Sequence, residues 1–152
     1  MNKHTPKHEL ATYDSDFHLW SQTQAAAIRE GKFAEIDLEN VAEEIESLGL
    51  SDKRAIKSWL EVLLLNLLKW QAQPEKRKGG WENSIEEARE ALADLIGDSP
   101  SLKSYTAKVL AESYARARRK AARETGLAKE HFPSECAFSL LDVLDDEFLP
   151  GV

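Results

Sequence analysis

The most apolar stretch of this chain is WLEVLLLNLLKW, residues 59–70. Drawn as a helix, it points leucine side chains in almost every direction, and a helix that is apolar all round lies inside a bundle. We therefore expect a central helix here, around which the other helices pack. The stretch has 12 residues and contains charged and amide side chains, whereas a membrane span needs about 20 apolar residues.

The segments on either side of this stretch also have helical periodicity, and no useful length shows the alternation of a strand. Helices are predicted from about 14–16 to 30, 37 to 48, 51 to 73, 81 to 96 and 100 to 125, with a short one from Ser139. The fold class is therefore all-α: one bundle of about five main helices around a central apolar helix, plus a short C-terminal helix. We expect residues 1–12 to form a flexible leader and residues 13–152 to form a single helical domain.

The boundaries of the helix at 37–48 follow from two residues. Asp37 is a good N-cap, and Gly49 is a good residue to end a helix, because glycine adopts the left-handed conformation easily. Leu38, Val41 and Ile45 continue with Leu48 as a regular apolar stripe. We expect this stripe to be buried in the bundle and to contribute to its stability.

The charge, the cysteine content and the start of the chain exclude or disfavour several classes of protein. The 152 residues include 27 acidic and 20 basic side chains, a formal net charge of −7, which disfavours broad non-specific binding to nucleic acid. A single cysteine, Cys136, rules out an intramolecular disulfide framework. The start of the chain has no apolar core of a secretion signal. These features favour a soluble cytoplasmic protein without a membrane anchor.

Several ordered motifs carry a resemblance to a known family. They are Tyr13-Asp14-x-Asp16-Phe17-x-x-Trp20, the run from Asp37 to Gly49, Leu67-Leu68-Lys69-Trp70-Gln71-x-Gln73-Pro74, Trp81-x-x-Ser84-Ile85, Glu124-Thr125-Gly126-Leu127, Phe132-Pro133-x-x-Cys136 and Phe148-Leu149-Pro150. In this order and over nearly the whole chain, the sequence resembles the bacterial family known as Domain of Unknown Function 29. The resemblance implies a helical fold of about this length and no assigned activity.

One position departs from that family. Its members often carry histidine immediately before the Leu-Leu-Lys-Trp run, and here the residue is Asn66. A neutral imidazole binds metals and carries protons near pH 7, whereas an amide does neither. Any metal or acid–base role of that histidine is therefore in doubt in this chain.

A polar pocket is the first candidate site. Asn40, Glu44 and Ser47 share one side of a helix beside the apolar stripe, and Asn66 shares a face with Trp70 and Gln73. If these two faces meet, they form a pocket with aromatic walls, in which Glu44 would act as a base or ligand. The alternative is a buried polar network that sets the register of the helices, because buried polar groups must find partners.

A basic face is the second candidate site. Four basic residues occupy one side of the helix at 100–125: Arg116, Arg119, Lys120 and Arg123. They would suit a phosphate group, a nucleic acid or an acidic protein. Alternatively, they are a solvated helix end, where cations are favoured by the helix dipole.

No catalytic set, glycine-rich phosphate loop or convergent group of metal ligands is discernible, so we predict no catalytic residue, metal or cofactor. The leading hypothesis is a non-enzymatic module that binds a macromolecular partner, with protein favoured over nucleic acid. Two alternatives stay open: a small-molecule, metal-binding or hydrolytic protein that uses the pocket around Glu44 and Asn66, and a nucleic-acid or toxin–antitoxin accessory protein that uses residues 116–123. A homo-oligomer is also possible through contact between acidic and basic faces.

Overall fold

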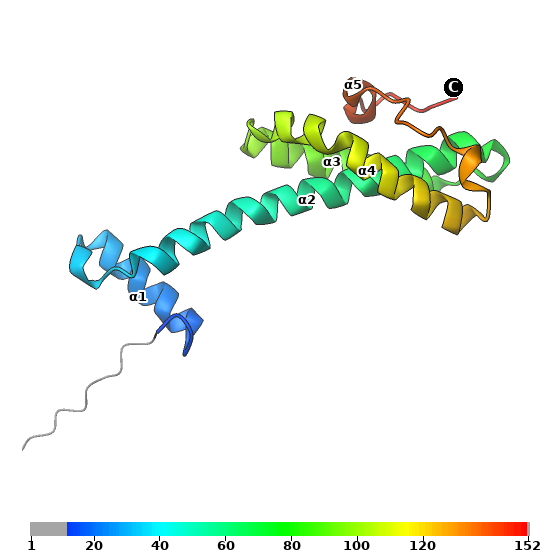
Figure 1. The fold of residues 1–152 in the computed structure, drawn as a ribbon. Helices are drawn as coiled ribbons and strands as arrows, with labels where there is room; N and C mark the ends of the chain where they lie inside the picture. Colours follow the sequence, from blue (N-terminus) through cyan, green and yellow to red (C-terminus); the bar gives the residue numbers. More distant parts are fainter. Residues whose placement is uncertain (1–11, 152) are drawn as a thin grey trace, which may run out of the picture. The chain divides into compact units, whose positions relative to one another are not determined.

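The computed structural model describes residues 12–151, and the elements in this range are all helical (Figure 1). The helices are α1 (Phe17–Arg29), α2 (Leu38–Ala72), α3 (Gly79–Asp98), α4 (Leu102–Thr125) and α5 (Leu140–Leu144), with 3₁₀ turns at η1 (Phe33–Glu35), η2 (Pro74–Lys76) and η3 (Lys129–His131). The predicted all-α class is confirmed. The expected leader at 1–12 lies, except for Thr12, outside the described residues.

The predicted division between helices at 37–48 and 51–73 is wrong, because both belong to the single 35-residue helix α2. Gly49 lies inside this helix and does not have the positive φ of a helix-ending glycine. Neighbouring residues that favour helix outweigh the about 1 kcal/mol that an interior glycine costs. Residues 12–151 therefore contain four long helices and one short one, instead of five long helices and a short one.

By its internal contacts, the chain divides into two compact units, of which the first ends at Gly49 and the second begins at Leu50. The expectation of one domain over 13–152 stays a prediction.

Side-chain hydrogen bonds cap α1 and hold the turn that follows it in the first unit. Asp16 caps α1 by accepting a hydrogen bond from the backbone of Leu19 at 3.0 Å, as acidic residues do at helix N-termini. One side of α1 is buried through Trp20, Gln24 and Ala27. The Gln24 side chain donates to the Glu35 carbonyl (3.2 Å) and accepts from the Asp37 amide (2.6 Å). Gln24 thereby holds the turn between α1 and α2.

The second unit contains the apolar core. Leu63, Leu64, Leu67 and Leu68 are at most 1% exposed, which confirms that the stretch at 59–70 is the centre of its bundle. Apolar faces of α3 and α4 complete the core with residues such as Leu92. Figure 1 shows both helices alongside the C-terminal part of α2.

The ion pairs between α2 and α4 show how these helices run. Lys57 pairs with Glu112 at 3.2 Å, and Lys69 pairs with Glu124 at 2.9 Å. Both pairs have the same sequence offset, so α4 and the second half of α2 are parallel, and α3 connects them.

The C-terminal segment returns to the core. Ser139 caps α5 by accepting from the Asp142 amide at 3.1 Å. Val143 is fully buried, and Phe148 and Leu149 pack against the core. Within residues 12–151, no helix combines the length and the apolar character that crossing a membrane requires.

Candidate functional site

The first half of the predicted polar pocket is built around the start of α2. The Asp37 carboxylate accepts hydrogen bonds from the Asn40 side chain (2.8 Å) and from the Trp20 indole (3.3 Å). The bond from Asn40 lowers the pKa of Asp37, although burial acts in the opposite direction. The carboxylate is therefore ionised at neutral pH, and it links α1 to the first turn of α2.

Glu44, one turn farther along α2, accepts a hydrogen bond from the Tyr13 hydroxyl. This bond, followed by burial, raises the pKa of Tyr13 to about 12. The Tyr13 ring packs edge-on against Phe17 and Trp20, with centroid distances of 5.6 and 4.9 Å. Glu44 is half-buried, and Ser47 is exposed. The Glu44 carboxylate thus anchors an aromatic cluster.

The second half of the pocket, Asn66, Trp70 and Gln73, lies in the other unit. Asn66 is 6% exposed and donates to the carbonyl of Val62 in its own helix at 2.8 Å. The Trp70 indole nitrogen is buried and finds no hydrogen-bond partner within residues 12–151. Because the two halves belong to different compact units, the joint pocket that includes Asn40, Glu44 and Ser47 stays a prediction.

The basic face lies on the exposed side of α4, where all four predicted residues are exposed. Arg116 pairs with Glu112 at 3.3 Å, and Lys120 pairs with Glu61 of α2 at 2.6 Å. Within the described range, neither Arg119 nor Arg123 makes an ion pair. These two guanidinium groups, one turn apart, are the free positive charges of the face.

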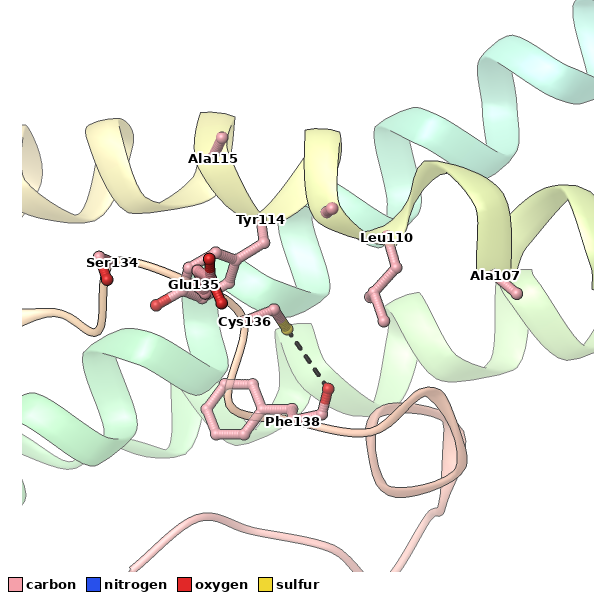
Figure 2. Close-up of a pocket in the computed structure, with 9 residues that line it drawn as sticks. Ala107, Leu110, Tyr114, Ala115, Ser134, Glu135, Cys136 and Phe138 are labelled. Carbon is pink, nitrogen blue, oxygen red and sulfur yellow. Dashed lines mark hydrogen bonds between the residues drawn. The ribbon is translucent and has the colours of Figure 1, made fainter.

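A pocket of about 430 Å³ lies between α4 and the segment 134–138 (Figure 2). Its walls include Ala107, Leu110 and Phe138. The thiol of Cys136 donates to the Phe138 carbonyl at 3.4 Å, and burial raises the pKa of this thiol. Burial therefore disfavours the nucleophilic thiolate form of Cys136.

Sequence reasoning missed Arg89. This α3 residue is 3% exposed, and its guanidinium donates to the carbonyls of Val143 (2.9 Å), Asp146 (3.4 Å) and Phe148 (2.7 Å). Burial lowers the pKa of Arg89. The signal was present: Arg89 follows Ile85 by four residues and so shares the buried face of α3.

The apolar stripe at the start of α2 differs most from expectation. It was expected to be buried, yet Leu38, Ile45 and Leu48 are 71%, 64% and 70% exposed, and Val41 is half-buried. The prediction that this stripe lies within the bundle is wrong. Large apolar side chains grouped on an accessible surface are typical of an interaction site.

A metal site has no support in the described part of the chain, where no three histidine, cysteine or acidic side chains converge.

In comparisons with known proteins, the model of a family described as Domain of unknown function DUF29 matches residues 12–149. No curated protein and no solved structure matches the chain.

Proposed function

The chain belongs to the DUF29 family, whose function is unknown, and on this premise we propose that it is a non-enzymatic module that binds a protein partner. The observation that carries the proposal is the apolar row Leu38, Val41, Ile45 and Leu48, which we call the α2 stripe. Three of its side chains are exposed, and Val41 is half-buried. Burying one leucine-sized side chain gains about 1.5–3 kcal/mol. A partner that covers the α2 stripe would gain this energy several times.

The polar groups near the stripe support binding rather than catalysis. Asp37 is engaged with Asn40 and Trp20, and Glu44 is engaged with Tyr13. Carboxylates held in this way stabilise the local fold around the stripe. They provide a firm base for an apolar contact surface.

Site-specific photo-cross-linking in the native host tests this proposal. A benzoylphenylalanine in place of Ala42, which is exposed beside the stripe, is expected to cross-link a distinct protein. The same group in place of the exposed Glu90 of α3 is the control. The cross-link should disappear when Ile45→Ser and Leu48→Ser are combined. Equal cross-linking from both positions would contradict the proposal, and a cross-link to the same chain alone would instead indicate a homo-oligomer.

A second candidate function uses the basic face of α4. Arg119 and Arg123 are exposed and make no ion pair within residues 12–151, which favours an acidic macromolecule there, either a protein or a nucleic acid. Combined charge reversal of Arg116, Arg119 and Arg123 should abolish such binding, whereas Lys108→Glu, on the same helix, should not. If the partner is a nucleic acid, its binding should be weaker at the higher of two salt concentrations. Binding that is insensitive to salt would refute this candidate.

A further inference from the structure

We infer that the partner of the α2 stripe is a basic amphipathic helix of another protein. This inference rests on the proposed function and names the chemistry of the partner. It depends on three properties of the first unit: the spacing of the apolar residues, the charge around them and the small size of the apolar area.

The spacing selects a helical occupant. Leu38, Val41, Ile45 and Leu48 follow one another by three, four and three residues on α2, which is the spacing by which one helix packs side chains into the gaps of another. Over about three turns, the stripe presents a continuous row about 15 Å long. An apolar row of this kind meets an amphipathic helix through positions of matching spacing.

The charge selects a basic occupant. Residues 12–49 contain nine acidic and two basic side chains, a formal charge of −7, which equals the net charge of the whole chain. Glu44 borders the stripe between Val41 and Leu48, and Glu39 and Glu46 lie farther round on the other side of the helix. Within the described residues, neither Glu39 nor Glu46 has an ion-pair partner. The Glu44 carboxylate is engaged by the Tyr13 hydroxyl. Lysine and arginine side chains that flank an apolar row would therefore meet mainly the carboxylates of Glu39 and Glu46.

The same charge disfavours a second copy of this chain. Two α2 stripes facing each other would bring two segments of charge −7 together, and such like-charge contact opposes association. The four side chains of the stripe also fall well short of the about 1,200–2,000 Å² that a stable interface buries. Electrostatic attraction therefore has to supply part of the affinity, and only an oppositely charged partner provides it.

The test uses three synthetic helical peptides of about 18 residues, in which leucines repeat at three- and four-residue spacing and lysine, glutamine or glutamate occupies the flanks. Each peptide carries a fluorophore and is titrated with the full-length protein at about 50 and 200 mM salt. The lysine peptide should bind at least about tenfold more tightly than the glutamine peptide, and the glutamate peptide should not bind. Raising the salt concentration should weaken the binding of the lysine peptide and leave the affinity for the glutamine peptide unchanged.

Variants assign this binding to the stripe. Combined Ile45→Ser and Leu48→Ser should weaken binding of the lysine peptide at least about tenfold. Leu141→Ser is the matched control, because Leu141 of α5 is 81% exposed and belongs to the other unit. Circular dichroism of both variants should equal that of the unchanged protein, since the replaced side chains are exposed.

Each other outcome has a defined meaning. Equal binding of the lysine and glutamine peptides, with both lost in the Ile45→Ser/Leu48→Ser variant, would overturn the basic partner while leaving the protein-binding function intact. If the Ile45→Ser/Leu48→Ser variant binds the lysine peptide as tightly as the unchanged protein does, the binding is due to charge alone. That result would overturn both the basic partner and the protein-binding function of the α2 stripe. The unchanged protein could also form a dimer that excludes the peptides and that the variant abolishes. In that case a second copy of the chain occupies the α2 stripe, which contradicts this inference.

Discussion

Arg89 shows how a single buried side chain determines the path of a terminal segment. Its planar guanidinium carries several donors in a fixed arrangement, and three of its nitrogens each meet a different carbonyl between Val143 and Phe148. Those carbonyls lie around and after the short helix α5, where the backbone provides few partners of its own. The charge is stabilised by these carbonyl dipoles rather than by a carboxylate at hydrogen-bond distance.

Replacing Arg89 tests this role. Arg89→Met should lower the free energy of unfolding by about 3 kcal/mol, because buried carbonyls lose their donors. Arg119→Met is the matched control, and since Arg119 is exposed and has no ion pair within residues 12–151, it should change stability by less than about 0.5 kcal/mol. Urea unfolding of the full chain measures both. An equal effect of the two substitutions would show that the three hydrogen bonds do not stabilise the fold.

Tyr13 gives a pH-dependent prediction. Its pKa is raised to about 12 from 10.0, first by the hydrogen bond to Glu44 and then by burial. Because the folded-state pKa is raised, the contact stabilises the protein fully below about pH 10 and is lost as the pH rises toward 12. The difference in tyrosinate absorbance between the unchanged protein and Tyr13→Phe should have its midpoint near pH 12. In a Glu44→Ala background the midpoint should fall toward 10.0, and an unchanged midpoint would refute the assignment.

At the scale of an element, α2 shows that a local stop signal does not end a helix by itself. Gly49 would end α2 only if it adopted a left-handed conformation, as Gly126 does after α4 with φ of 73°. Gly49 lies within α2 and does not have a positive φ. A Cβ atom added at this position would meet no atom within 4 Å. Its cost to the helix is therefore conformational entropy alone.

Alanine substitution distinguishes the two glycines. Gly49→Ala should raise the stability of α2 by about 0.5–1 kcal/mol and increase the helical signal in circular dichroism. Gly126→Ala should lower stability by about 1 kcal/mol, because alanine is strained at positive φ. Thermal unfolding followed at 222 nm measures both changes. A loss of stability for Gly49→Ala would mean that the helix ends at Gly49 in solution.

At the scale of the whole molecule, apolar burial is unequal between the two units. In the first unit, α1 buries only Trp20, Gln24 and Ala27, whereas the second contains a cluster that includes Leu60, Leu64 and Leu92. Regions with few buried apolar contacts open at lower free energy than the core. We therefore expect the unit that carries the proposed binding surface to be the less stable of the two.

Hydrogen exchange read by mass spectrometry tests this difference. Amides of the segment 63–68 should exchange at least about tenfold more slowly than those of α1, after correction for intrinsic rates. The N-terminal half of α4 provides an internal comparison, and it should resemble 63–68 because Thr106 and Val109 are buried. Equal protection of α1 and 63–68 would indicate a single cooperative unit and contradict the prediction.

The helical segments and the centre of the core could be predicted from the sequence. Apolar periodicity is a local property, so it identified the helical segments and the central position of Leu63 to Leu68. It also predicted a basic face on α4, because helical spacing alone decides which side chains share a side. The family resemblance, carried by ordered motifs, is likewise confirmed over residues 12–149.

Only the tertiary structure decided which apolar and polar faces find partners. A stripe such as Leu38 to Leu48 shows which side of a helix favours burial, but burial requires an opposing surface, and the periodicity contains no information about one. For the same reason, the buried Arg89 was missed, since its acceptors lie more than 50 residues away in the sequence. The continuation of α2 through Gly49 was also a tertiary result, because the backbone angle of a glycine depends on what the rest of the chain favours.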